Sequence, residues 1–167
     1  MTAVDRSEFV ERFGGVFEHS SWVAERAFDH GVADTGSAAS VHSAMVEAFQ
    51  RASEAERLAV LRAHPDLAGK LAIAGKLTED SRNEQAGAGL DRLSAEEHAR
   101  FTALNSAYVE KFGFPFIIAV KGLNKDDILG AFETRINNSA AEEFGTACKQ
   151  VERIAMLRLN SMLPGGQ

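Results

Sequence analysis

The chain has 167 residues and a mass of 18.0 kDa, which is the length of one domain. Apolar residues make up 45% of it and charged residues 25%, as in ordinary globular proteins, so disorder is excluded for most of the chain. Cys148 is the one cysteine, which excludes a disulfide framework and a zinc site built on thiolates. We therefore expect a single domain over residues 1–167.

The charge balance is acidic, with 18 basic residues against 24 acidic ones and a net charge of −6. This balance disfavours nucleic acid as the main partner, because phosphate binding requires a basic face. No apolar run approaches the roughly 20 residues of a membrane-spanning helix. The first residues also lack the apolar core of a secretory signal. We expect a cytoplasmic protein that binds neither nucleic acid nor membranes.

The first part of the chain predicts four helices. Only three prolines occur in the whole sequence, so long stretches are free of helix breakers. Gly31 is suited to ending the second helix, and Ser53 with Glu56 forms a capping-box pattern at the start of the fourth. The four predicted helices cover Ser7–Phe13, Ser21–His30, Ser37–Arg51 and Glu54–Ala63.

A histidine and a proline follow these helices. Pro65 favours the first position of another helix, with His64 near its N-cap. An imidazole at that place faces the positive end of the helix dipole, which favours its neutral form. A neutral imidazole can take up a proton near pH 7 and return it, so His64 is suited to proton transfer. A capping or packing role for His64 is the alternative.

The next stretch, Gly69 to Leu77, superficially resembles a phosphate-binding loop. Its glycines are separated by five residues rather than four, and Leu77 stands where a Mg²⁺-binding Ser or Thr is needed. We therefore expect a helix end or turn with solvated lysines.

A polar region from Leu77 to Leu93 predicts irregular structure with a short helical turn from Ser81. Ser81 and Glu84 form a capping-box pattern, and a plain cap is one interpretation of them. A capped helix start also offers backbone donors to a carboxylate. Glu84 and the Gln85 amide can supply an acceptor and a two-way hydrogen bonder to a polar heterocycle.

The second half predicts three helices and one interruption. The helices follow Ser94, Asn124 and Ser139, and Gly113 is placed to end the first of them in the left-handed conformation. Between the first two lies an apolar run over 114–120, which we expect to be extended and buried. Its backbone groups must be satisfied, and a polar ligand is one candidate for that task. The expected fold is an all-α, compact bundle of about eight helices with this one extended segment.

Other common chemistries lack support. No two of the five histidines stand three or four residues apart, so no metal site is predicted. Cys148 falls on the apolar stripe of the last helix, where a buried core residue is expected. No serine occupies a Gly-x-Ser-x-Gly elbow.

Four motifs, in order, resemble those of the OHCU decarboxylase family, and the resemblance extends from about Phe9 to Leu159. OHCU is 2-oxo-4-hydroxy-4-carboxy-5-ureidoimidazoline, which this family converts to (S)-allantoin late in urate degradation. Ile136 stands where leucine is commoner. The motifs are His64-Pro65-Asp66-Leu67, Ser81-x-x-Glu84-Gln85, Lys111-Phe112-Gly113-Phe114-Pro115-Phe116-Ile117-Ile118 and Thr134-Arg135-Ile136-x-Asn138.

The resemblance implies an all-helical single domain that forms a homodimer, acts on a small-molecule ureidoimidazoline and uses no metal or organic cofactor. It places the family's catalytic histidine on His64 and its active-site glutamate on Glu84. The substrate-contacting positions fall on Pro65, Ser81, Gln85, Phe116, Ile117, Ile118, Ala119 and Val120.

This chemistry needs no cofactor as an electron sink, because the ring C=N next to the departing carboxylate can accept the electron pair. His64 would take the hydroxyl proton, while Glu84 orients His64 or holds the hydroxyl and ureido groups. Arg135 is a weaker candidate for a carboxylate contact, and we expect it in a surface or interface salt bridge. The rival functions are a non-enzymatic helical binding module and another cofactor-free acid–base enzyme acting on a ureide.

Overall fold

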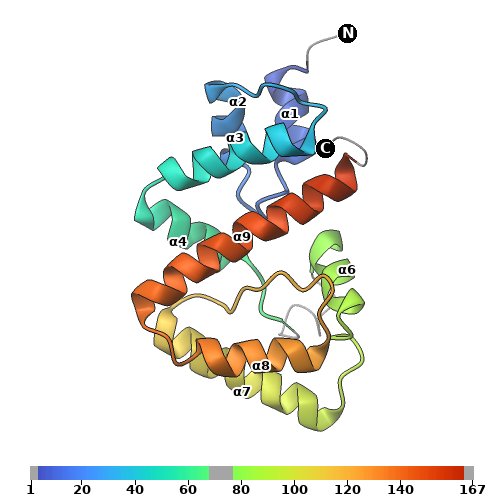
Figure 1. The fold of residues 1–167 in the computed structure, drawn as a ribbon, viewed down its shortest axis with the longest axis vertical. Helices are drawn as coiled ribbons and strands as arrows, with labels where there is room; N and C mark the ends of the chain where they lie inside the picture. The colour runs from blue at the N-terminus through green and yellow to red at the C-terminus, as the bar shows by residue number, and fades with distance from the viewer. Residues whose placement is uncertain (1–3, 68–76, 164–167) are drawn as a thin grey trace. The chain divides into compact units, whose positions relative to one another are not determined.

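The computed structural model describes residues 4–67 and 77–163, and over these ranges the protein has eight helices and no strand (Figure 1). The all-α prediction is confirmed. No helix within these ranges is long and apolar enough to cross a membrane. The helices are α1 (Arg6–Phe13), α2 (Trp22–His30), α3 (Ala38–Arg51), α4 (Glu54–Ala63), α6 (Glu79–Gly87), α7 (Ala95–Phe112), α8 (Lys125–Arg135) and α9 (Ala140–Met162).

The chain divides into two compact units, one formed by Met1–Ala63 with Val151–Gln167 and the other by His64–Gln150. Helix α9 supplies residues to both. Every residue of the predicted site falls in the second unit. The expectation of one domain over residues 1–167 stays a prediction.

The first unit is packed around phenylalanines. Phe9 contacts Phe13 and Phe28, with ring centroids 4.9 and 5.4 Å apart, and Phe17 lies 5.3 Å from Phe49. Within this unit α2 packs against both α1 and α3. The unit thus has an apolar core of its own.

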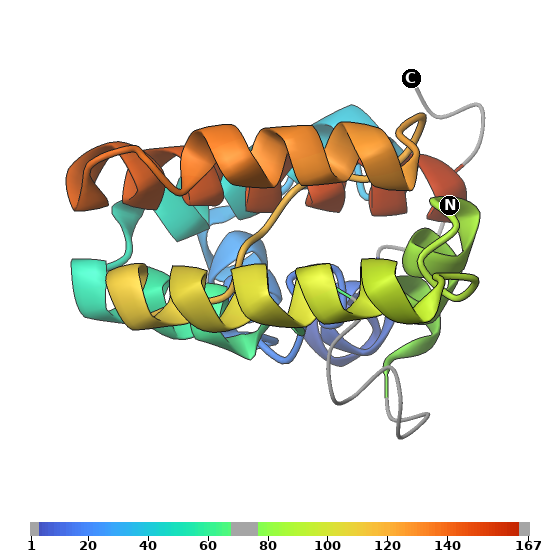
Figure 2. The same ribbon diagram turned by 90° about the horizontal axis from the view of Figure 1, so that it is seen from below.

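The second unit is organised around α7. Phe101, Asn105 and Tyr108 recur at four- and three-residue spacing and are buried on one face of this helix. The Tyr108 ring contacts Phe116 and Phe132 edge-on, with centroids 5.4 and 5.8 Å apart. Helices α7 and α8 contact each other and run side by side (Figure 2), joined by the segment over 113–124.

That joining segment is the predicted interruption. It starts after Gly113, whose φ of 80° gives α7 the expected left-handed end, and no helix forms over 114–120. Six of its seven residues are buried. The prediction of a buried, non-helical segment is therefore confirmed.

Four of the predicted helix starts are confirmed by reciprocal hydrogen bonds. Ser53 and Glu56 bond each other's backbone N–H groups at 3.1 Å, and both Ser94 with Glu97 and Asn124 with Asp127 form capping boxes. At the last helix the Glu142 N–H donates to the Ser139 hydroxyl at 3.2 Å. The caps at Ser94, Asn124 and Ser139 set where α7, α8 and α9 begin, and all three caps lie in the second unit.

Two predicted helix starts are wrong. Helix α6 begins at Glu79, with Thr78 as N-cap accepting a 3.2 Å hydrogen bond from the Ser81 N–H, so Ser81 lies inside the first turn. Residues 65 and 66 lie outside any helix, so Pro65 does not open one. The stretch compared with a phosphate-binding loop, apart from Leu77, lies outside the described residues.

Candidate active site

The His64 segment is held by two side-chain amides. His64 is 8% exposed and directly follows the last residue of α4. Gln85 Nε2 donates to the Asp66 carbonyl at 3.3 Å, and Asn105 Nδ2 donates to the Leu67 carbonyl at 2.9 Å. Helices α6 and α7 thus fix consecutive carbonyls just beyond His64. The motif that contains His64 and the motif that contains Gln85 therefore meet here, through two residues that are 19 positions apart in the sequence.

Helix α6 carries the second motif on one face. Ser81 and Gln85, four residues apart, are 4% and 5% exposed. Glu84 lies between them in the sequence, next to this face, and is half-buried. The Thr78 cap fixes where α6 begins, and it thereby fixes the positions of Ser81, Glu84 and Gln85 along the helix.

The third motif contributes the segment Phe116–Val120. The Phe116 ring stacks on Phe132 with centroids 3.9 Å apart and planes 9° from parallel. Arg135 Nη1 donates to the Ile117 carbonyl at 2.7 Å, and the Ala119 N–H donates to Gln150 Oε1 at 2.9 Å. A third bond joins the Leu123 N–H to the Val120 carbonyl at 2.9 Å. The other backbone groups of Phe116–Val120 bond to no residue that the structure describes.

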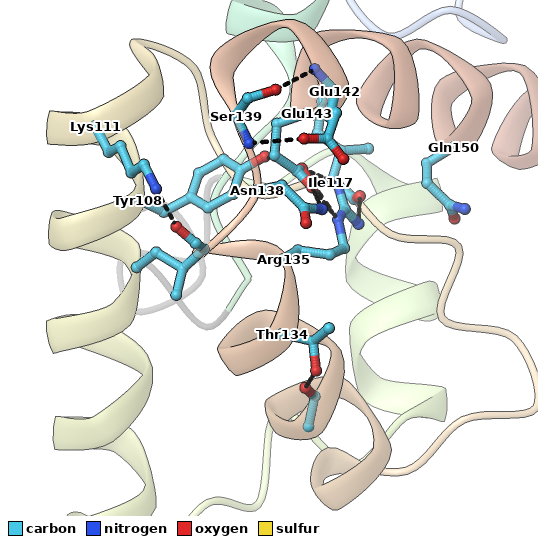
Figure 3. A network of polar contacts seen from close by, with 12 residues as sticks. Tyr108, Lys111, Ile117, Thr134, Arg135, Asn138, Ser139, Glu142, Glu143 and Gln150 are labelled. Atoms are coloured by element: carbon cyan, nitrogen blue, oxygen red, sulfur yellow. Dashed lines mark hydrogen bonds and ion pairs between the residues drawn. The ribbon is translucent and has the colours of Figure 1, made fainter.

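The fourth motif forms a buried ion pair. Arg135 Nε lies 2.8 and 3.1 Å from the two carboxylate oxygens of Glu143, and Nη2 lies 3.0 Å from one of them (Figure 3). The Tyr108 hydroxyl donates to the same carboxylate at 2.8 Å. Arg135 also lies over the Phe116 ring, with its guanidinium carbon 4.4 Å from the centroid. Arg135 is 9% exposed, so its predicted salt bridge exists, but the expected surface position is wrong.

The buried pair of Arg135 and Glu143 changes the acidity of Tyr108. Burial raises the pKa of the Tyr108 hydroxyl far above its ordinary value, and its hydrogen bond to the negative Glu143 carboxylate raises it further. Tyr108 is therefore a neutral donor at ordinary pH, and it helps to satisfy a fully buried charge.

One face of α7 connects the motifs. Asn105 holds the Leu67 carbonyl, and Tyr108, three residues on, contacts the Phe116 ring. Residues three apart are neighbours on a helix surface. These contacts connect the chain after His64 and the Phe116 ring to one face of α7. That His64, Glu84 and the Phe116–Val120 segment form one site stays a prediction. The individual roles of His64 and Glu84 stay predictions.

Comparisons with known proteins agree with the motifs. The family model described as OHCU decarboxylase matches residues 2–160. The chain belongs to the OHCU decarboxylase family.

Relatives in this family span nearly the whole chain. A 2-oxo-4-hydroxy-4-carboxy-5-ureidoimidazoline decarboxylase from Haloferax volcanii is 44% identical over 93% of this chain and 89% of its own length. One from Halalkalicoccus jeotgali is 41% identical over 97% and 89%. A uric acid degradation bifunctional protein from a Bacillus species is 38% identical over 100% of this chain, which spans 32% of that protein.

Two solved structures share the fold. A crystal structure of (S)-allantoin synthase has a TM-score of 0.72 and 32% identity, and the match covers 94% of this chain and 50% of that one. A crystal structure of OHCU decarboxylase in the presence of (S)-allantoin has a TM-score of 0.71 over 89% of this chain and 94% of that one. At 22% identity, this second likeness shows the fold alone.

Three polar residues that bond to the motifs or to their partners were not predicted from the sequence. Asn105, Glu143 and Gln150 each bond a predicted motif or its partner. Asn105 had a signal, since it is a polar residue one position from the apolar stripe of α7. Glu143 had none, because it follows the capping Glu142 and nothing in the sequence separates a surface carboxylate from a buried one.

Proposed function

We propose that this chain decarboxylates 2-oxo-4-hydroxy-4-carboxy-5-ureidoimidazoline to (S)-allantoin in urate degradation. The observation that carries the proposal is the family match over residues 2–160, which includes all four motifs. The contact of Gln85 with the Asp66 carbonyl supports it, because it joins the motif of His64 to the motif of Glu84. The 44% identical relative with the decarboxylase name supports the substrate.

The reaction breaks the bond between the ring C4 and its carboxylate, and CO₂ leaves. The electron pair of that bond forms a C4=C5 double bond, while the former C=N pair moves to the ring nitrogen and is protonated. The 4-hydroxyl then loses its proton as the C4 carbonyl forms, and C5 gains a proton on one face. The ring itself is the electron sink, so the protein has to orient the substrate and move protons.

His64 takes the hydroxyl proton in this proposal. Glu84 orients His64 or holds the hydroxyl and ureido groups, and the substrate ring is fixed by Pro65, Ser81 and Gln85 on one side. On the other side the ring meets Phe116, Ile117, Ile118, Ala119 and Val120. General acid–base assistance of this kind contributes about 10²–10⁴ in rate.

The chain acts as a cytoplasmic homodimer in this proposal. Light scattering after size exclusion tests the assembly, since the dimer has twice the 18.0 kDa mass of one chain. A mass of 18.0 kDa at working concentration would contradict the dimer and leave the activity standing.

The activity is tested by generating the substrate in situ with urate oxidase and hydroxyisourate hydrolase, then following circular dichroism and CO₂ release. We expect rapid formation of the S enantiomer. Racemic allantoin at the uncatalysed rate would contradict the proposed function, and product without CO₂ would favour a hydrolase.

The role of His64 is tested by His64→Ala, which should lower kcat by about 10²–10⁴. His30→Ala, at the exposed end of α2, is the matched control and should keep full activity. Full activity in His64→Ala would remove only the role of His64.

A further inference from the structure

Asn105 is a polar residue in the middle of the buried face of α7. It is 6% exposed and lies between Phe101 and Tyr108, which are both fully buried. Asparagine is a weaker helix former than the apolar residues that usually fill such a position. Burying its amide is also costly unless the polar atoms at both ends find hydrogen bonds. Packing of the core therefore does not explain an asparagine at this position.

The two ends of the Asn105 amide differ in their surroundings. Nδ2 donates to the Leu67 carbonyl at 2.9 Å. Oδ1 is buried and has no hydrogen-bond partner among residues 4–67 and 77–163. A buried acceptor of this kind is rare in a native protein and indicates a donor that the described chain does not supply. Because bulk water does not reach Oδ1, that donor has to be enclosed together with it.

The Nδ2 contact also locates Oδ1 relative to the predicted site. The nitrogen and the oxygen of an amide are about 2.3 Å apart, so Oδ1 lies within about 5 Å of the Leu67 carbonyl oxygen. Tyr108, which follows Asn105 by three residues on the same face of α7, contacts the Phe116 ring. The free acceptor thus lies beside the chain that follows His64, on the face of α7 that also contacts the third motif.

We propose that Asn105 is a specificity-determining residue whose Oδ1 accepts a hydrogen bond from an N–H of the substrate's ureido group. This inference rests on the proposed function and deepens it. A carboxamide oxygen accepts hydrogen bonds and cannot donate them, so it selects a group that carries N–H hydrogens. The ureido group carries several. The bond from Nδ2 to the Leu67 carbonyl fixes which end of the amide is presented as the acceptor.

Two ligands separate this contact from a general effect on the site. (S)-Allantoin carries the ureido group, and hydantoin has the same ring without it. Asn105→Leu replaces the amide by an apolar side chain of similar size. We expect it to raise the Kd of (S)-allantoin about tenfold or more, because a hydrogen bond to a buried acceptor is lost. The Kd of hydantoin should stay nearly unchanged, and titration calorimetry measures both constants.

The matched control is Asn160→Leu, which makes the same change at an exposed position of α9 and should bind both ligands as wild type does. Circular dichroism checks that Asn105→Leu is folded. If the folded variant loses affinity for both ligands by the same factor, Asn105 only holds the chain after His64, and the inference is overturned. An unchanged Kd for (S)-allantoin overturns it as well.

A measurement on the wild-type protein keeps the inference testable if Asn105→Leu does not fold. In protein labelled with ¹³C and ¹⁵N, the Asn105 carboxamide carbon reports on hydrogen bonds that its oxygen accepts. Saturating (S)-allantoin should shift this resonance, whereas hydantoin should leave it in place. A resonance that does not move with (S)-allantoin, or that moves equally with hydantoin, overturns the ureido contact.

These binding measurements do not depend on catalysis, so the two proposals can fail separately. A protein that shows the Asn105 shift with (S)-allantoin but has no decarboxylase activity would overturn the proposed function and keep the contact. An active decarboxylase whose Asn105 resonance and Asn105→Leu affinities do not distinguish the two ligands would keep the proposed function and overturn the contact.

Discussion

The Glu143 carboxylate is fully buried and receives hydrogen bonds from α7 and from the end of α8. A buried charge is costly unless it is paired and hydrogen-bonded, and here the partner is the Arg135 guanidinium. Removing one partner leaves the other charge uncompensated.

Glu143→Gln should therefore lower the free energy of unfolding by about 3–5 kcal/mol, measured by urea denaturation. The double variant Arg135→Met with Glu143→Leu should cost much less, because neither charge is left alone. Equal stability of Glu143→Gln and wild type would show that the buried pair is not formed.

Tyr108 offers a measurement at the same site, because it is the chain's one tyrosine. Burial and the bond to Glu143 raise its pKa above the ordinary 10.0. Absorbance at 295 nm should show no ionisation of the folded protein near pH 10. Since only the unfolded chain ionises there, the stability that Tyr108 contributes is complete below pH 10 and falls as pH rises above it. Ionisation of the native protein near pH 10 would contradict this environment.

For single residues, the sequence was enough to recognise the four motifs but not to predict which side chains contact them. The neighbourhood of His64 and Gln85 follows from motifs that the family resemblance supplied, and the structure joins them through the Asp66 carbonyl. The burial of Arg135 could not be predicted, because its partner Glu143 lies on another helix and only the tertiary fold brings them together. The position of Asn105 beside the apolar stripe of α7 was a signal, but its contact could not be predicted, because its partner is a loop carbonyl.

Helix ends show what local sequence can and cannot decide. Reciprocal caps such as Ser94 with Glu97 use groups within one turn, so the sequence contains the whole interaction. At α6 two caps competed, because Thr78 and Ser81 are both good N-cap residues. Starting at Thr78 places Glu79 and Asp80 in the first turn, where the helix dipole favours acidic side chains. The longer helix therefore forms.

Two glycines give a matched test of the helix elements. Gly113 ends α7 at a φ of 80°, so Gly113→Ala should lower the free energy of unfolding by about 1–2 kcal/mol. Gly145 lies inside α9, where an added Cβ meets nothing within 4 Å, so Gly145→Ala should raise it by about 0.5–1 kcal/mol. Urea denaturation measures both. A Gly113→Ala variant as stable as wild type would contradict the left-handed end of α7, and a destabilised Gly145→Ala variant would contradict the open space at Gly145.

The whole molecule raises the question of cooperativity. The two compact units share α9, a single helix of 23 residues that runs from one into the other. Because a helix is stabilised along its length by packing, loss of either unit should weaken the part of α9 in the other. We expect one calorimetric transition with equal calorimetric and van't Hoff enthalpies. Two separated transitions would contradict the prediction of a single domain.

The central claim is that the His64 and Glu84 motifs and the Phe116–Val120 segment form one substrate site. A crystal structure of the protein soaked with (S)-allantoin tests this most directly. We predict that the ureide lies between the His64 and Glu84 side chains, with its ring against the Phe116–Val120 segment. A ligand bound elsewhere, or His64 and Glu84 directed into separate surroundings with no room for a ring between them, would contradict the account.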